Sequence, residues 1–325
     1  MRNANRQTRR DFIKTSTTLT LAAGAFGASG LGLAADKAAR WPVAIRDTHL
    51  KVAGKPDCWT ALKALGADGV EVEINEEMLC FSLFHPARKY VLANADGVRT
   101  LNDDLTANGA VITAFCMHNR LDERLERELE WTKKLVKAAT QLKVSVIRID
   151  VVPRATAVDQ FLPFAIKGCK QLCDIAEGTP VRFGIENHGR ITNDPQFLEK
   201  LFDGVASTRL GLTLDAMNFY WFGHSLNELY GIYEKLAPRT FHTHCKNLRY
   251  PDDRKNVRRP MGWEYEKYAA PIYEGDIDYQ RVGAILRKAN YRGDLCLENE
   301  CLGHFPKEQQ ADVLKKEVAL LKRLA

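Results

Sequence analysis

The sequence repeats one pattern eight times: a short apolar run rich in β-branched residues, followed by an amphipathic segment. The predicted strands are Val43–Thr48, Gly69–Ile74, Val111–Cys116, Val144–Ile149, Val181–Glu186, Leu210–Asp215, Arg239–His244 and Asp294–Glu298. The predicted helices are Asp57–Leu65, Val98–Asn108, Leu125–Leu142, Asp159–Ala176, Asp194–Phe202, Leu226–Leu236, Tyr279–Lys288 and Glu308–Leu324. This alternation is typical of the α/β class and predicts a single (β/α)8 TIM barrel, whose reactive side chains gather at the C-terminal ends of the strands.

Residues 1–35 depart from this pattern and are predicted to be an export signal. A basic start with Arg9-Arg10 precedes a Gly/Ala/Thr-rich stretch and small residues up to Ala35, the usual order in such signals. The paired arginines resemble the twin-arginine type, so we expect a periplasmic or otherwise exported protein whose barrel domain is residues 36–325. The stretch is too weakly apolar for a stable membrane helix of about 20 residues, so cleavage is expected near Ala34 or Ala35, with an uncleaved anchor as the alternative.

The charge of the chain bears on its partner. The formal net charge is +6, but residues 1–35 contain five basic side chains and one acidic side chain. The barrel domain is therefore nearly neutral, whereas a nucleic-acid partner requires a strongly basic surface that neutralises phosphates. These features favour a small-molecule substrate, and they leave the oligomeric state open.

Four successive predicted strands end in a side chain that can bind a metal, namely Glu186, Asp215, His244 and Glu298. In a parallel barrel these ends are neighbours, so three carboxylates and one imidazole can converge. Three carboxylates that are close together cannot all stay ionised without a compensating cation, which predicts a divalent metal. A carboxylate-rich set with one imidazole favours Mn²⁺, with Mg²⁺ or Co²⁺ as alternatives and Zn²⁺ less favoured.

The same strand ends resemble those of the xylose isomerase-like TIM barrels, which are sugar isomerases and epimerases related to AP endonuclease family 2. The resemblance covers essentially all of residues 36–325 and rests on the motifs Ile-Glu186-Asn-His-Gly, Leu-Thr-Leu-Asp215, Thr-His244-Cys-Lys246-Asn and Tyr291-Arg-Gly-Asp-Leu-Cys-Leu-Glu298. It implies that Glu186, Asp215, His244 and Glu298 bind the metal. It also implies that Glu186 and Glu298 exchange protons with the sugar, one as base and the other returning the proton.

The segment after the sixth strand departs from the pattern of the nuclease branch. Many relatives have Asp-x-x-His there, but this chain has Asp215-Ala-Met-Asn218. The multi-zinc nucleases use that histidine and a further Asp-x-His pair, and no such pair follows His244. The departure argues against nuclease chemistry.

Other side chains in loops at the predicted barrel mouth are candidates for substrate contact. They are His118, His188, Asn218, Trp221 and Lys246. For the two histidines the alternative is an ordinary surface position, and for Lys246 it is a pair with an acid. His242 lies two residues before His244 and should share its side of the strand, deeper in the barrel.

The sequence leaves open the orientation of some charged residues and the role of one long connection. Glu71, Arg148 and Asp150 face the barrel mouth only if the predicted strand boundaries are correct to one residue. Residues 246–278 are polar, with several arginines and aromatic residues. A structureless connection of this length within a compact domain is usually functional, so we expect a lid or a substrate-binding loop.

Together these features predict a divalent-metal-dependent isomerase or epimerase of a non-phosphorylated sugar or keto-sugar. The reaction would be proton abstraction through an enediolate, because a metal that polarises a carbonyl acidifies the neighbouring C–H. The Gly-rich phosphate cradle of the Walker type is not seen in the sequence. The first alternative is a lyase that cleaves 3-keto-glycosides by metal-assisted β-elimination. A non-catalytic sugar-binding barrel is the second, and a nuclease resembling the AP endonucleases is the least favoured.

Overall fold

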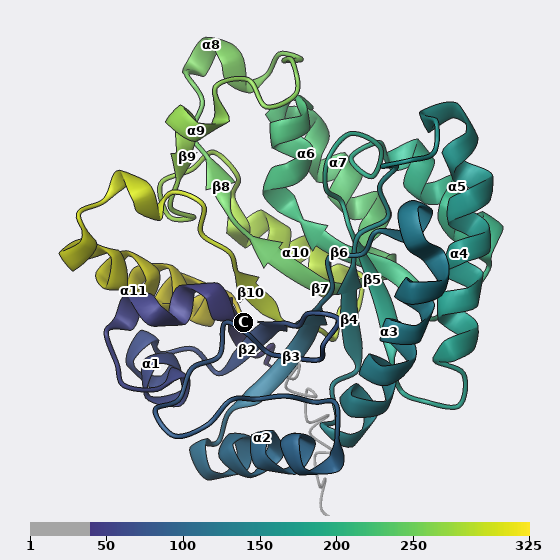
Figure 1. Ribbon diagram of the computed structural model, residues 1–325. Helices are drawn as coiled ribbons and strands as arrows, with labels where there is room; N and C mark the ends of the chain where they lie inside the picture. Colours follow the sequence, from purple (N-terminus) through teal and green to yellow (C-terminus); the bar gives the residue numbers. More distant parts are fainter. Residues whose placement is uncertain (1–39) are drawn as a thin grey trace, which may run out of the picture. The chain divides into compact units, whose positions relative to one another are not determined.

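The computed structural model describes residues 40–325, so the predicted signal of residues 1–35 lies outside the described residues. The described chain forms a closed barrel of eight parallel strands, which confirms the predicted TIM barrel (Figure 1). The strands are β1 (Val43–Arg46), β2 (Gly69–Glu73), β3 (Val111–Cys116), β4 (Val146–Ile149), β5 (Arg182–Glu186), β6 (Leu210–Asp215), β7 (Thr240–Cys245) and β10 (Leu295–Leu297). They follow chain order around the barrel, and β10 closes it between β7 and β1.

Helices surround the strands, and every predicted helix is present with ends shifted by a few residues. They are α1 (Cys58–Leu65), α2 (Ala95–Asn108), α3 (Leu121–Gln141), α4 (Phe161–Ile175), α5 (Pro195–Val205), α7 (Leu226–Leu236), α10 (Tyr279–Lys288) and α11 (Lys307–Leu324). Local signals set the ends of α1: the Asp57 side chain accepts hydrogen bonds from the N–H groups of Trp59 and Thr60, and Gly66 ends the helix at a φ of 80°. None of the helices in residues 40–325 is long and apolar enough to cross a membrane.

Further short helical elements lie in the connections. They are α6 (Ala216–Phe222) and the 3-10 helices η1 (Asp47–Ala53), η2 (Val158–Gln160), η3 (Ala237–Arg239) and η4 (Leu302–His304). Of these, α6 matters most for the site, because it directly follows β6 and its first turn is capped by Asp215.

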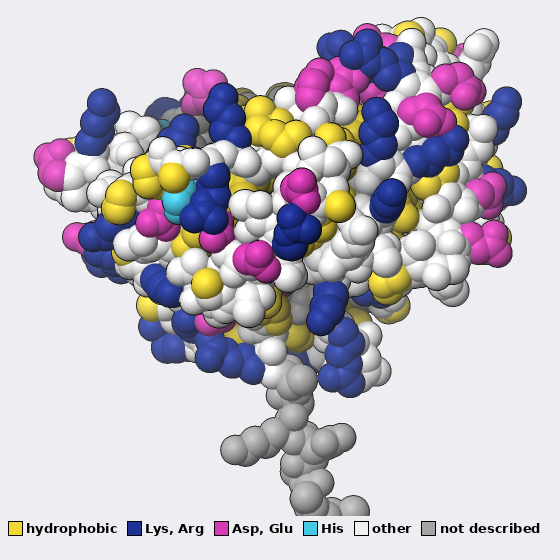
Figure 2. Space-filling model, turned by 60° about the horizontal axis from the view of Figure 1, so that its bottom comes forward, with side chains coloured by type: hydrophobic (Ala, Val, Ile, Leu, Met, Phe, Trp, Pro, Cys, Tyr) yellow, Lys and Arg dark blue, Asp and Glu magenta, His cyan; other side chains and the backbone are white. Residues whose placement is uncertain are grey.

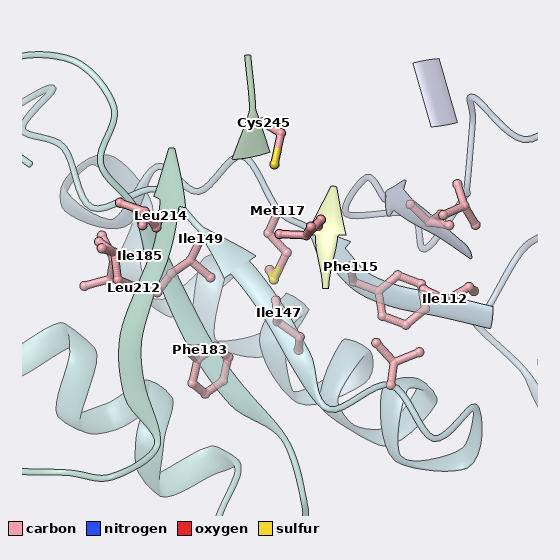
Figure 3. Packing of buried hydrophobic residues seen from close by; sticks show 14 of the residues in the cluster. Ile112, Phe115, Met117, Ile147, Ile149, Phe183, Ile185, Leu212, Leu214 and Cys245 are labelled. Carbon is pink, nitrogen blue, oxygen red and sulfur yellow. The ribbon is translucent and has the colours of Figure 1, made fainter. Parts of the chain in front are cut away.

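Alternation along the strands separates an apolar layer from a charged interior. Successive side chains point to opposite faces of a strand, and Ile147 and Ile149 of β4 belong to the apolar layer (Figure 3). Between them, Arg148 is buried among polar groups and contacts Asp150 and Glu186. The barrel interior therefore contains ionised groups where branched apolar side chains usually lie.

The outer surface has no dominant charge on the face shown in Figure 2. Lys and Arg side chains are interspersed with Asp and Glu side chains over most of this face, with Lys and Arg more frequent along its lower edge. This distribution agrees with a nearly neutral barrel domain.

Residues 246–278 are folded, which corrects the expectation of a structureless connection. Strands β8 (Asn247–Leu248) and β9 (Ala269–Ala270) pair in antiparallel fashion, with helices α8 (Asp252–Lys255) and α9 (Tyr265–Tyr268) between them (Figure 1). Tertiary hydrogen bonds that the local pattern does not reveal hold the segment in this form. Its role as a lid or substrate-binding loop stays a prediction.

One buried arginine fixes this segment to the end of α6. The Arg259 guanidinium donates hydrogen bonds to the main-chain oxygens of Tyr220 (3.0 Å) and His224 (2.8 Å). It also lies 4.4 Å from the ring centroid of Tyr220 and 4.3 Å from that of Tyr250. The segment is therefore joined to the helix that follows Asp215.

Glu317 of α11 connects the base of the segment to the end of β10. Its carboxylate accepts hydrogen bonds from the Ile272 main-chain N–H (2.8 Å) and from the Asn299 side-chain amide (2.7 Å). Burial raises the pKa of Glu317 from 4.5 to about 7, although both hydrogen bonds lower it, and the charge of Glu274 adds to the rise. The folded protein thus holds a proton on Glu317 that the unfolded chain releases at lower pH.

This raised pKa predicts a specific pH dependence of stability. The contribution of Glu317 is fully present below about pH 4.5 and is lost as the pH rises through about 7. Replacement by Gln removes the titration, so the free energy of unfolding of Glu317→Gln relative to the wild type should rise by up to about 3 kcal/mol between pH 4.5 and pH 8. Urea unfolding of both proteins across this range measures the difference. A difference that stays constant with pH would contradict the prediction.

Candidate metal centre

Four side chains from neighbouring strand ends converge at the mouth of the barrel. Glu186 ends β5, Asp215 ends β6, His244 lies near the end of β7 and Glu298 directly follows β10. One ligand atom of each lies within 4.8 Å of the others. The structure therefore brings together all four residues predicted as metal ligands, and their binding of a metal stays a prediction.

The Nδ1 atom of His244 is the centre of this arrangement. It lies 3.1 Å from Glu186 Oε1, 3.0 Å from Glu298 Oε2 and 4.0 Å from Asp215 Oδ2. An unprotonated Nδ1 and carboxylate oxygens are all acceptors, so a proton or a cation must lie between them. Burial lowers the pKa of His244, but the charges of Glu298 and Glu71 outweigh it and raise the value to about 10. A divalent cation at the same point would take the place of that proton.

Lys246 supplies positive charge beside the same oxygens. Its buried Nζ lies 2.8 Å from Asp215 Oδ2, 2.9 Å from Glu298 Oε2 and 2.7 Å from Glu300 Oε1. The first two oxygens are buried without a well-aligned hydrogen bond. Burial raises the pKa of Asp215, and the Lys246 charge opposes this rise. Carboxylate oxygens that are buried, incompletely paired and aimed at one point suit a hard divalent cation.

Each of the two glutamates is held on its other oxygen by a buried arginine. Glu186 Oε2 contacts Arg148 Nη2, and Glu298 Oε1 lies 2.6 Å from Arg46 Nη1. Arg148 also lies 3.1 Å from Asp150 Oδ2. Each glutamate thus directs one oxygen at His244 while an arginine fixes the other.

Charged residues around the four predicted ligands were themselves predicted only in part. Arg46 and Glu73 were not identified as site residues, while Glu71, Arg148 and Asp150 depended on the strand boundaries. The structure shows all five close to the site, with Arg46 Nε 3.2 Å from Glu71 Oε2 and Arg46 Nη2 3.3 Å from Glu73 Oε2. A usable signal was present, because charged residues alternate with apolar ones in β2 and at the end of β4 and so share one face.

His118 and His188 lie on the β3 to β5 side of the mouth. Both rings are about half exposed. Both also contact the Asp150 carboxylate: His118 Nδ1 lies 3.2 Å from Oδ2, and His188 Nδ1 lies 3.5 Å from Oδ1. His118 Nε2 also lies 3.1 Å from Glu73 Oε1. Hydrogen bonds with Asp150, Cys116 and Glu73 raise the pKa of His118 to about 11. Both rings are thus held at the mouth by acids, and their contact with substrate stays a prediction.

Asn218 and Trp221 are placed by α6. The Asp215 carboxylate accepts the main-chain N–H of Asn218 (2.9 Å), and the Asn218 amide donates to Glu186 Oε1 (3.3 Å). Asn218 therefore lies directly beside the oxygen of Glu186 that faces His244. Trp221 joins α6 to residues 246–278, because its main-chain oxygen accepts the Gly262 N–H (2.8 Å) and its ring meets Tyr265 edge-on. Its predicted part in substrate binding is untested.

Comparisons with known proteins agree with the fold. The family model described as xylose isomerase-like TIM barrel matches residues 59–324. No curated protein sequence gives a significant match.

Three solved structures illustrate the likeness in fold. The IolI protein with a bound zinc atom has a TM-score of 0.64 at 14% identity, with 86% of this chain and 97% of that chain covered. The apo 3-keto-D-glucoside 4-epimerase YcjR from E. coli has a TM-score of 0.61 at 13% identity, covering 87% and 100%. A xylose isomerase-like TIM barrel protein from Mycobacterium smegmatis in complex with magnesium has a TM-score of 0.61 at 14% identity, covering 87% and 97%.

Proposed function

The chain belongs to the xylose isomerase-like TIM barrel family, and from this premise we propose that it is a metal-dependent isomerase or epimerase of a non-phosphorylated sugar or keto-sugar. The observation that carries the proposal is the convergence of three carboxylates on His244 Nδ1, two of them braced by arginines. The structural relatives include an epimerase of a 3-keto-D-glucoside, which supports carbon–hydrogen chemistry beside a carbonyl.

The proposed metal ligands are Glu186, Asp215, His244 and Glu298. The carboxylate-rich ligand set favours Mn²⁺. Mg²⁺, Co²⁺ and Zn²⁺ are the alternatives, and solved structures of this fold hold zinc or magnesium. A divalent cation held there would polarise a carbonyl and its neighbouring hydroxyl and so acidify the C–H between them.

The proposed proton-transfer groups are Glu186 and Glu298. They come from strand ends on either side of β7, β5 for Glu186 and β10 for Glu298, and both contact His244 Nδ1. One can take a proton from a carbon held between them, and the other can return a proton to the opposite face. Arg148 and Arg46 orient the two carboxylates.

The remaining predicted site residues are proposed to bind the sugar. His118 and His188 present half-exposed rings at the mouth, and Asn218 and Lys246 lie beside the carboxylates. Trp221 would supply an apolar face for the sugar ring. Export through the twin-arginine route, with residues 1–35 as the signal, would suit a substrate without phosphate.

A lyase acting on 3-keto-glycosides is the second candidate, and the position of Lys246 favours it. After a glutamate takes the proton beside the keto group, the electron pair would form a carbon–carbon double bond as the bond to the aglycone oxygen breaks. The leaving oxygen then needs a proton, and the buried ammonium 2.9 Å from Glu298 Oε2 could supply one.

Isotope exchange separates these candidates. Protein loaded with Mn²⁺ is incubated in D₂O with ketoses and with 3-keto-glycosides, and the products are followed by NMR. Deuterium entering beside the carbonyl without bond cleavage is the result expected of an isomerase or epimerase. Release of aglycone would identify the lyase instead. Metal binding without any exchange or cleavage would favour a sugar-binding barrel and overturn the proposal.

A further inference from the structure

Ionisable side chains fill the barrel interior beneath the four proposed ligands. Glu71, His242 and Asp294 are each at most 2% exposed. Removing such groups from water is costly, and apolar residues of similar volume would often give equal or greater stability. The fold alone therefore does not explain them.

Three successive contacts connect these side chains to His244. Asp294 Oδ1 lies 2.6 Å from His242 Nδ1, and His242 Nε2 lies 3.5 Å from Glu71 Oε1. The other oxygen of Glu71, Oε2, lies 2.8 Å from His244 Nε2. Carboxylates and imidazoles thus alternate from the start of β10 to the mouth of the barrel.

The topology makes this chain a feature of the closed barrel. His242 and His244 are two residues apart on β7, so both rings point inward. Glu71 belongs to β2, which β1 and β10 separate from β7. Its side chain therefore reaches across the interior and contacts both rings, one with each oxygen.

An ionised carboxylate only accepts hydrogen bonds, so the nitrogen facing Glu71 must carry a proton. In His244 that nitrogen is Nε2, which leaves the lone pair of a neutral ring on Nδ1, facing Glu186 and Glu298. We propose that Glu71, backed by His242 and Asp294, fixes the tautomer and the orientation of His244 so that Nδ1 is its ligand atom. The inference rests on the proposed function, because the lone pair on Nδ1 matters only if His244 binds a metal.

His242 and Asp294 act as positioning residues behind Glu71: His242 contacts Glu71, and Asp294 contacts His242. Glu71 Oε1 is buried without a well-aligned hydrogen bond, and the nearest ring nitrogen is His242 Nε2. Asp294 accepts a hydrogen bond from His242 Nδ1 and so orients that ring. Asp294 is fixed in turn by Tyr291, whose hydroxyl donates to its main-chain oxygen (2.8 Å). Partners of this kind around a metal-bound histidine typically contribute about 10–100-fold to metal affinity.

The experiment compares Glu71→Gln with Glu73→Gln as a matched control. Both residues lie on β2, both contact Arg46, and both substitutions remove one negative charge. Only Glu71 contacts His244. Calorimetric titration with Mn²⁺ should give an affinity about 10–100-fold weaker for Glu71→Gln and a nearly unchanged affinity for Glu73→Gln. An equal loss in both variants would overturn the inference.

A second measurement does not depend on a bound metal. In ¹⁵N-histidine-labelled protein, the proton on His244 Nε2 should exchange slowly with water in the wild type and in Glu73→Gln, and much faster in Glu71→Gln. Equal exchange rates in all three proteins would overturn the inference even if no cation binds, whereas absence of Mn²⁺ binding by the wild type would refute the proposed function alone. If Glu71→Gln fails to fold, Asp294→Asn replaces it and should show a smaller change in the same direction.

Discussion

Glu186→Gln is expected to lower the rate of deuterium exchange beside the carbonyl of a keto-sugar by about 10²–10⁴-fold for the epimer whose proton Glu186 takes, the usual contribution of a general base. Glutamine has nearly the same volume and keeps an oxygen that can face His244, but it cannot take a proton. The measurement is the initial rate of exchange in D₂O, with bound metal determined in the same samples. Glu76→Gln is the control, because Glu76 pairs with Arg124 outside the cluster of four proposed ligands, and it should exchange at the wild-type rate.

The two glutamates can be told apart by starting from each epimer separately. If one carboxylate serves each face, Glu186→Gln should stop exchange from one epimer and leave exchange from the other. Glu298→Gln should show the opposite preference. Both variants should lose epimerisation, because it needs both groups. Equal loss from both epimers in both variants, with metal still bound, would refute the two-base arrangement.

The convergence of Glu186, Asp215, His244 and Glu298 could be predicted because each follows an apolar run at a boundary that the local pattern reveals. Asp215 shows the limit of what this local pattern predicts. It ends β6 as expected, yet its carboxylate also caps α6 through the Asn218 N–H, and α6 was not predicted. Its residues Phe219 to Phe222 are all aromatic, so they show no amphipathic period that would indicate a helix.

The interior could be predicted less well, because its contacts join residues far apart in the chain. Arg46 pairs with Glu298 from β1 to the end of β10, and this contact exists only when the barrel closes. The acceptors of Arg259 are main-chain oxygens, which no sequence pattern marks. Strand alternation showed that Glu71 and Arg148 could face inward. Which partner each would meet depended on the register and the closure of the sheet.

Arg148→Met is expected to lower the free energy of unfolding by about 3–5 kcal/mol, because it leaves the buried carboxylates of Glu186 and Asp150 without their main positive partner. Methionine preserves much of the volume, so the loss reflects charge more than packing. Arg127→Met is the matched control: Arg127 pairs with Glu76 near the surface, and its loss should cost less than about 1 kcal/mol. Urea unfolding of the metal-free proteins measures both changes.

The double variant Arg148→Met/Glu186→Gln tests whether the cost of losing Arg148 arises at Glu186. Removing the charge of Glu186 should recover part of the stability, so the two substitutions should be non-additive. Additive losses would mean that Arg148 stabilises the barrel mainly through Asp150 and the Met117 main-chain oxygen, which it also contacts (3.2 Å). Non-additive losses would show that Glu186 is ionised in the folded protein, the state that both metal binding and proton abstraction require.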